Sequence, residues 1–287
     1  MMSRRSAVQR TAAALAAASG LAHHLDAAPE AATGLKGRVR HSACRWCYGK
    51  IPLEEFVKAS KEIGLAAIDL LTVEEIPVAR QHGLTCAMVA GVPGGIAQGL
   101  NRLENHDKIV AWFEQTAPRV AELGCRNMIV FSGNRAGLGD DEGLRNCATG
   151  IKRLLPVLEK HDVVAVMELL NSKVDHADYM CDRTPWGARL CQEVGSERFK
   201  LLYDIYHMQI MEGDVIATIR AYHSCIAHYH TGGVPGRNEI DETQELNYPA
   251  ILRAIVDTGY QGFVAQEFIP KRDPLASLRQ AVGICDV

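Results

Sequence analysis

Four side chains that can bind a metal ion or carry a proton follow short apolar runs in the second half of the chain. They are Glu168, Asp204, His230 and Glu267, and the run Val163–Met167 before Glu168 is typical of the four. Carboxylate oxygens and imidazole nitrogens suit Mg²⁺ or Mn²⁺ better than they suit metals that prefer thiolates. The residue types therefore predict a divalent metal site, provided that the fold brings the four positions together.

The elements around these side chains alternate between strand and helix. Each apolar run is short, rich in β-forming residues and followed by a loop and a helix-like stretch. Strands are predicted over 38–43, 66–70, 84–89 and 126–131, and four more end at 168, 204, 230 and 267. Helices are predicted over 52–63, 73–81 with an interruption at Pro77, 106–123, 140–159, 185–194, 214–222 and 248–258, and from 274 onward.

Eight strand–helix units of this kind predict a (β/α)8 TIM barrel that forms one domain over residues 35–287. The strands of such a barrel are parallel, and their C-terminal ends all lie on one face. A Rossmann-type sheet is the alternative fold, but it does not usually contain eight units. The barrel would place the four side chains around one small volume.

Composition limits the classes of partner. The chain has 287 residues, of which 47% are hydrophobic, so it can bury a large core. A formal net charge of −3 and only 6% aromatic residues argue against a nucleic-acid partner. The glycine-containing loop over 91–105 lacks both GxGxxG spacing and a following GK[ST], so no nucleotide cofactor is predicted.

Residues 1–34 differ from the rest of the chain. Arg4 and Arg5 precede an alanine-rich stretch over 12–18, which resembles a twin-arginine export signal. The stretch is too short to span a membrane as a helix. We therefore expect a leader that directs export to the periplasm, and a disordered or weakly helical extension of a cytoplasmic protein is the alternative.

The nine cysteines are odd in number and scattered, unlike the framework of a disulfide-stapled domain. Most are expected to be buried small hydrophobic residues. Cys44-Arg45-Trp46-Cys47 has CxxC spacing but no second CxxC and no histidine pair at zinc spacing. A redox or zinc function for this motif is therefore the weaker interpretation.

Glu168 and Glu267 close the fifth and eighth predicted strands, so they can flank a substrate between them. A divalent ion that binds a carbonyl and a neighbouring hydroxyl polarises the C=O bond and acidifies the adjacent C–H. One carboxylate can then remove a proton and the other can return it. This arrangement predicts isomerisation or epimerisation of a small hydroxy-carbonyl substrate through a metal-stabilised enediolate, although a lone carboxylate at a strand end can also simply order a loop.

Longer segments carry a resemblance to a known family. The segments 167–172, 202–209, 233–239 and 266–268 resemble the hydroxypyruvate isomerase family, a group of xylose isomerase-like TIM barrels. The loops over 99–101, 105–107 and 131–134 are also similar, so the resemblance covers nearly everything from about residue 38 onward. It implies interconversion of hydroxypyruvate and tartronate semialdehyde.

The same resemblance implies roles for individual residues. Glu168 and Glu267 are the proton-transferring pair, and Asp204 and His230 complete the metal shell with them. Substrate-binding roles are implied for His207 and Arg237, with a packing histidine and a surface arginine as the plain alternatives. A guanidinium is well shaped to hold a carboxylate by two hydrogen bonds.

His230 is a departure, because the hydroxypyruvate group often carries Gln at this position whereas ketose epimerases carry His. A ketose 3-epimerase or another sugar isomerase on the same scaffold therefore remains open. A metal-dependent DNA-repair endonuclease would need more histidine ligands and a basic groove. An exported, non-catalytic sugar-binding protein is the alternative from another class, and it would not need two opposed proton carriers. A homo-oligomer also remains open.

Overall fold

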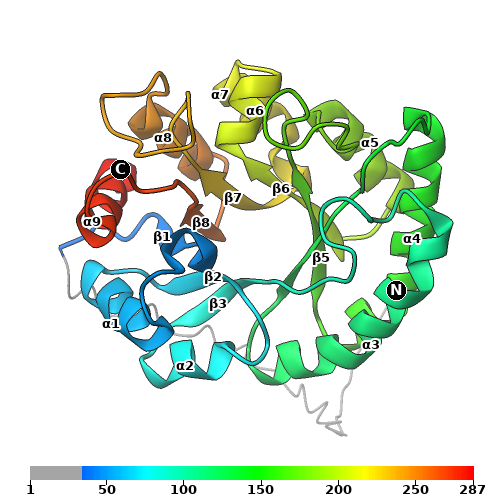
Figure 1. The fold of residues 1–287 in the computed structure, drawn as a ribbon, viewed down its shortest axis with the longest axis horizontal. Coiled ribbons are helices and arrows are strands. Elements are labelled where there is room, and N and C mark those ends of the chain that lie inside the picture. Colours follow the sequence, from blue (N-terminus) through cyan, green and yellow to red (C-terminus); the bar gives the residue numbers. More distant parts are fainter. Residues whose placement is uncertain (1–33) are drawn as a thin grey trace, which may run out of the picture. The chain divides into compact units, whose positions relative to one another are not determined.

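A computed structural model describes residues 34–287, in which eight parallel strands form a ring surrounded by helices (Figure 1). This confirms the predicted (β/α)8 barrel. The predicted leader, with Arg4 and Arg5, lies outside the described residues apart from its last position and stays a prediction.

The strands follow one another around the ring in the order β1-β8-β7-β6-β5-β4-β3-β2, and all pairs are parallel. Their bounds are β1 Arg40–Ala43, β2 Ala67–Leu71, β3 Thr85–Val89, β4 Asn127–Val130, β5 Val164–Leu169, β6 Phe199–Asp204, β7 Ile226–Thr231 and β8 Phe263–Gln266.

The ring closes between β1 and β2, the two ends of that order. Cys44 and Asp69 form a parallel bridge there, and the Ala66 amide donates to the His41 carbonyl at 2.9 Å. We call this junction the β1–β2 seam.

The helices lie outside the strands, and α9 lies beside α1 where the outer ring closes (Figure 1). Their bounds are α1 Leu53–Ile63, α2 Ile76–Gln81, α3 His106–Glu122, α4 Asp140–Lys160, α5 Thr184–Val194, α6 Ile205–Met211, α7 Val215–Tyr222, α8 Tyr248–Asp257 and α9 Pro274–Cys285, with short 3-10 helices at Arg45–Tyr48, Leu103–Asn105 and His223–Cys225. Within residues 34–287, every helix is too short or too polar to cross a lipid bilayer.

Helix ends follow from local sequence signals. The Asn247 side chain accepts from the Ala250 amide at the start of α8, and Asp273 does the same for Ala276 at the start of α9. Such caps satisfy backbone donors that have no partner within the helix. At the other end, α1 stops at Gly64, whose φ of 103° is a left-handed conformation that favours glycine.

The barrel interior is apolar at one end and polar at the other. Met88, Ile129, Val166 and Leu202 belong to a buried apolar cluster inside the ring. Residues two apart in a strand point to the same side. Glu168 therefore points inward after Val166, and the polar end of the interior lies where the strands end.

Two helices differ from the sequence-based prediction. Pro77 does not interrupt α2 but lies in its first turn, where a proline is tolerated, and the helix begins at Ile76. The helix α6 was not predicted. It begins directly after β6 because the Asp204 carboxylate accepts from the His207 amide at 3.1 Å and caps the new helix.

Candidate active site

The four predicted metal ligands come together inside the barrel. Glu168, Asp204 and His230 lie on β5, β6 and β7, and Glu267 follows the last residue of β8. One ligand atom of each lies within 4.8 Å of those of the others, and all four side chains are buried. The parallel strands explain this convergence, because their C-terminal ends meet on one face.

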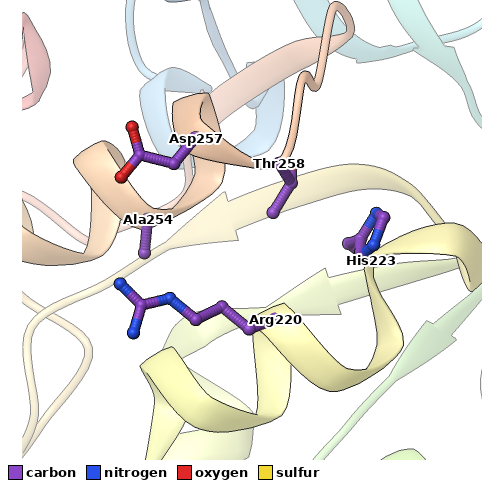
Figure 2. A pocket seen from close by; sticks show the side chains of 5 residues that line it. All are labelled: Arg220, His223, Ala254, Asp257 and Thr258. Atoms are coloured by element: carbon purple, nitrogen blue, oxygen red, sulfur yellow. The ribbon is translucent and has the colours of Figure 1, made fainter.

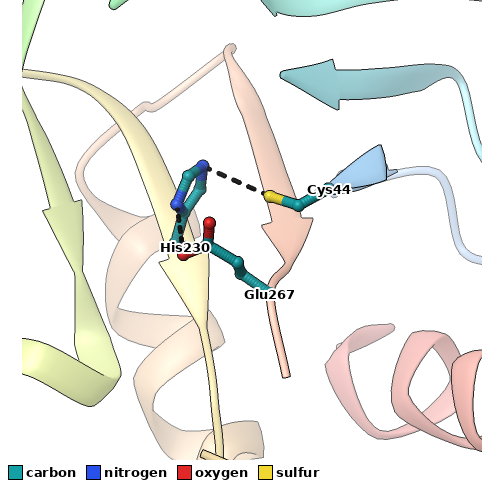
Figure 3. Close-up of side chains that lie close together, drawn as sticks. All are labelled: Cys44, His230 and Glu267. Atoms are coloured by element: carbon teal, nitrogen blue, oxygen red, sulfur yellow. Dashed lines mark hydrogen bonds and ion pairs between the residues drawn. The ribbon is translucent and has the colours of Figure 1, made fainter. Parts of the chain in front are cut away.

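His230 uses both ring nitrogens. Its Nδ1 lies 2.9 Å from Glu267 Oε2 and 3.2 Å from Glu168 Oε1. Its Nε2 lies 2.8 Å from Asp69 Oδ2, on the side where Cys44 also contacts the ring (Figure 3). The imidazole is thus fixed between a pair of carboxylates and a third carboxylate on the opposite side.

Asp69 is a site residue that sequence reasoning missed. Its Oδ2 also lies 3.1 Å from His228 Nε2 and 3.6 Å from the Cys44 sulfur, and all four residues are buried. Burial alone would raise the pKa of Asp69, but His228 and His230 lower it to about 2. The available signal was a carboxylate inside an apolar strand, together with histidines at alternate positions of β7.

Arg237 reaches the same site from the loop after β7. Its Nη2 lies 2.5 Å from Glu267 Oε2 and 3.4 Å from Asp204 Oδ2. The rings of Trp46 and Tyr206 lie 5.2 and 5.3 Å from its guanidinium carbon, within the range of cation–π contact. Its Nε is buried and has no hydrogen-bond partner within residues 34–287, so one donor remains for a ligand.

The CxxC segment contributes a tryptophan to the site. Trp46 is 46% exposed, and its Nε1 donates to Glu267 Oε1 at 2.7 Å. Arg45 holds the turn by donating to the carbonyls of Tyr48 and Ile51 at 2.7 and 2.9 Å. Cys44 and Cys47 are both free thiols, so the segment positions Trp46 rather than forming a disulfide.

The contacts of His207 define its tautomer. Asn171 Oδ1 accepts from two backbone amides, those of Val174 and Asp175, so its amide nitrogen faces His207 Nδ1 at 2.7 Å. Nδ1 is therefore the acceptor, and in the neutral ring the proton lies on Nε2. Burial and the charge of Arg237 hold the pKa of His207 well below its usual value. His207 is thus a neutral donor whose Nε2 lies 3.6 Å from Asp204 Oδ2.

The carboxylates of the site differ in their tendency to ionise. Burial and the charge of Glu267 raise the pKa of Glu168, and burial raises that of Asp204 well above its usual range. Burial would also raise the pKa of Glu267, but His230 and Arg237 hold it well below its usual value. Two carboxyl groups with pKa values pushed apart suit opposite roles in proton transfer.

The donor set fits a divalent cation. Burial would lower the pKa of His230, yet Cys44, Glu267 and Asp69 raise it well above its usual value, so a proton on Nδ1 faces Glu267 and Glu168. A cation can take the place of that proton, with Nδ1 and the carboxylate oxygens as ligands. Within residues 34–287, Glu168 Oε1 is buried and faces His230 Nδ1 at 3.2 Å, so a cation in place of the Nδ1 proton can take this oxygen as a ligand.

A surface hollow elsewhere in the described chain offers no comparable chemistry. It measures about 220 Å³ and lies between α7 and α8 (Figure 2). The residues that line it are Arg220, His223, Ala254, Asp257 and Thr258. None of them belongs to the buried cluster, which is therefore the candidate active site.

Comparisons with known proteins concern the family of the chain and its fold. A family model described as the xylose isomerase-like TIM barrel matches residues 48–284. A 2-oxo-tetronate isomerase from Cupriavidus necator is 30% identical over 239 residues, which are 79% of this chain and 90% of that protein. A human protein provisionally named a hydroxypyruvate isomerase is 28% identical over 268 residues, covering 86% of this chain and 88% of the human one.

Solved structures share the fold. An AP endonuclease of family 2 from Brucella melitensis has a TM-score of 0.74 at 23% identity, covering 84% of this chain and 97% of that one. A D-psicose 3-epimerase from Clostridium cellulolyticum, solved with D-tagatose, has a TM-score of 0.69 at 16% identity, covering 87% and 100%. At these identities the likeness concerns the barrel alone.

Proposed function

This chain belongs to the xylose isomerase-like TIM barrel family and is an isomerase, and on that premise we propose that it interconverts hydroxypyruvate and tartronate semialdehyde. One observation carries the proposal. A carboxylate oxygen of Glu168 lies within 4.8 Å of a carboxylate oxygen of Glu267, and Arg237 contacts Glu267. Two proton carriers beside a guanidinium suit a small substrate that has both a hydroxy-carbonyl group and a carboxylate.

Glu168, Asp204, His230 and Glu267 are the residues that would hold a divalent cation, for which Mg²⁺ and Mn²⁺ are the preferred candidates. When bound, such a cation polarises the substrate carbonyl and acidifies the neighbouring C–H bond, and its charge favours the ionised form of the surrounding carboxyl groups. Asp69 is the partner of His230 on the side away from the carboxylates.

The chain's own residues account for the proton movements. One glutamate of the pair Glu168 and Glu267 removes a proton from C3 of hydroxypyruvate, and the other delivers a proton to C2 of the resulting enediolate. The hydroxyl proton moves from the oxygen on C3 to the oxygen on C2, so the carbonyl group changes position and all atoms balance. His207 presents an Nε2–H to this region and can donate to the substrate oxygens.

Arg237 selects for an acidic substrate in this proposal. Its Nη2 is engaged by Glu267 and Asp204, whereas its buried Nε has no hydrogen-bond partner in the part of the chain that the structure describes. The Nε–H can donate to a substrate carboxylate beside the positive charge of the guanidinium. A neutral ketose lacks the negative charge that this donor favours.

A ketose 3-epimerase is the second candidate. His230 favours it, because the residue at this position distinguishes ketose epimerases from many members of the hydroxypyruvate group. The same two glutamates would then remove a proton and return it to the opposite face of one carbon. Assay of hydroxypyruvate against a panel of neutral ketoses, with Mg²⁺ or Mn²⁺ added and after chelation, separates the two functions.

The mechanism is tested by exchange of the carbon-bound proton with solvent. In D₂O, the wild-type protein should incorporate deuterium into hydroxypyruvate, as followed by proton NMR. Glu168→Gln and Glu267→Gln should each lower this exchange by at least about 100-fold while retaining some substrate binding. Glu212→Gln is the matched control, because Glu212 accepts from Thr184 outside the site. Normal turnover by both site variants would contradict the two-glutamate mechanism, and binding without any exchange by the wild type would favour the sugar-binding alternative.

A further inference from the structure

Asp69 is a buried charged residue to which the proposed reaction gives no role. It lies on β2, far along the chain from the strands that supply the predicted ligands, and its side chain has no solvent exposure. Its Oδ2 faces three donors, the nitrogens His230 Nε2 at 2.8 Å and His228 Nε2 at 3.1 Å and the Cys44 sulfur at 3.6 Å. An ionised carboxylate in an apolar interior is costly unless such donors compensate it.

The contact with His230 has a defined direction. An ionised carboxylate can only accept hydrogen bonds, so His230 Nε2 is the donor. The other nitrogen, Nδ1, then points toward Glu168 Oε1 at 3.2 Å and Glu267 Oε2 at 2.9 Å. Figure 3 shows the ring held between Cys44 on one side and Glu267 on the other.

We propose that Asp69 is the positioning residue that holds His230 with Nε2 protonated and Nδ1 directed to the metal site. Histidines that bind metals commonly donate their second N–H to a carboxylate, which fixes the tautomer and the ring and strengthens the ligand. The inference rests on the proposed function, because it assigns Asp69 a role toward the ion held by His230.

His228 and Cys44 contact the same Asp69 oxygen that faces His230. His228 Nε2 donates to this oxygen, and its Nδ1 is buried without a hydrogen-bond partner among the described residues. Within residues 34–287, His228 therefore reaches the predicted ligands through Asp69 and through the edge of the His230 ring, whose centroid lies 5.1 Å away. The network therefore predicts that substitution of Asp69 weakens metal binding most and that substitution of His228 weakens it less.

The test measures Mn²⁺ affinity by titration calorimetry on the metal-free full-length chain. Asp69→Asn keeps the size of the side chain but removes its charge, and we expect it to weaken Mn²⁺ binding by about 10- to 100-fold. His228→Gln keeps a donor toward Asp69, and a smaller loss is expected. Asp241→Asn is the matched control, since Asp241 is a buried carboxylate that accepts from Thr243 and Arg272 outside the site.

Two further measurements distinguish positioning from a purely structural role. Thermal unfolding of the metal-free variants should show a similar change for Asp69→Asn and Asp241→Asn, whereas only the former loses Mn²⁺ affinity. In histidine-¹⁵N-labelled protein loaded with Mg²⁺, His230 should carry its proton on Nε2, with its signals identified by their loss in His230→Gln. Asp69→Asn should alter these signals, and a structural role alone would leave the tautomer unchanged.

Each outcome decides one question. Unchanged Mn²⁺ affinity in Asp69→Asn, or a proton on Nδ1 of His230 in the Mg²⁺-loaded wild type, would overturn the positioning role while leaving the metal site intact. If the wild-type chain bound neither Mn²⁺ nor Mg²⁺, the metal site of the proposed function would fail first, and the role of Asp69 toward it would fail with it.

Discussion

His207 enters the site as a donor rather than as a base. The Asn171 amide occupies its Nδ1, and burial with the charge of Arg237 keeps the ring neutral. A neutral imidazole that carries its proton on Nε2 can polarise a carbonyl or pass a proton between substrate oxygens. The predicted substrate-binding role thus becomes a specific hypothesis about one N–H bond.

We expect His207→Gln to lower kcat by about 100-fold, because general acid–base groups typically contribute at least that much. Steady-state kinetics with hydroxypyruvate measure the effect. His176→Gln is the control, because its ring lies 5.3 Å from that of His207 without a hydrogen bond to it in the described residues. A loss of the same size in the control, or none in His207→Gln, would assign His207 to packing.

At the same scale, the predictability of a site residue depended on where it stands in its strand. Glu168 and Asp204 could be predicted because each ends an apolar run, and such positions converge in a parallel barrel. Asp69 lies inside its run, and its partners His228 and His230 are 159 and 161 residues away. Only the closed ring brings them together, so no local pattern marks the contact.

At the scale of elements, the turn after β1 positions Trp46. The CxxC spacing of this turn directs attention to its two cysteines instead. The turn places Trp46 across Glu267 and Arg237, with one hydrogen bond to a carboxylate that the proposed mechanism uses. A hydrogen bond to a charged group is worth about 1.5–3 kcal/mol. The turn therefore acts on function through the orientation of Glu267.

Trp46→Phe keeps a ring over Arg237 but removes the donor to Glu267. We expect kcat/KM for hydroxypyruvate to fall by about tenfold or more. The thermal midpoint should change little, because the side chain is 46% exposed. Trp112→Phe controls for loss of an indole elsewhere, and an unchanged kcat/KM in Trp46→Phe would contradict the orienting role.

The loop after β3 packs against the end of β4 through a glycine. A Cβ on Gly99 would lie 2.2 Å from the Phe131 carbonyl oxygen and 2.4 Å from the Gly133 amide nitrogen. The neighbouring Leu100 amide donates to that same carbonyl at 3.0 Å, so the two segments cannot move apart freely. Close backbone approach explains why glycine stands here.

Gly99→Ala should lower the free energy of unfolding by roughly 2–3 kcal/mol, because the clash is with backbone rather than with a flexible side chain. Gly283→Ala is the matched control of opposite sign. Gly283 is exposed within α9 with nothing near its missing Cβ, so alanine should stabilise by about 0.5–1 kcal/mol. Urea denaturation at equilibrium checks both values, and equal effects in the two variants would refute the packing argument.

Across the whole molecule, the alternation of strand and helix was sufficient to predict the barrel, since each buried run has the length and composition of a strand. The same reasoning missed α6, which is short and begins without a loop. Its start depends on Asp204, which the sequence marks as a metal ligand and the structure shows also to be a helix cap. Because Asp204 was already interpreted as a metal ligand, its second function as a helix cap was not predicted from the sequence.

Stability of the whole fold should depend on pH through His41. Burial lowers the pKa of this histidine from 6.5 to about 4, and neither of its ring nitrogens has a hydrogen-bond partner in residues 34–287. The unfolded chain therefore binds a proton at a higher pH than the folded chain does. The free energy of unfolding is not reduced by His41 above about pH 6.5, and it decreases as the pH falls from there toward 4. The decrease in the free energy of unfolding should reach roughly 3 kcal/mol, because one pKa unit corresponds to about 1.4 kcal/mol.

His41→Phe should flatten the pH dependence of the unfolding free energy between pH 4 and 6.5, the interval set by the two pKa values. Urea denaturation at a series of pH values measures it. His223→Gln, at an exposed histidine, is the control and should keep the slope of the wild type. Equal slopes in wild type and His41→Phe would show that other groups dominate acid denaturation.

The β1–β2 seam joins the mechanical closure of the barrel to its chemistry, because the bridge that shuts the ring is made by Cys44 and Asp69. Any transient parting of these two strands would withdraw Asp69 from His230 at the same moment. Hydrogen exchange at the Ala66 amide, which spans the seam, therefore reports how often the site is dismantled by thermal motion.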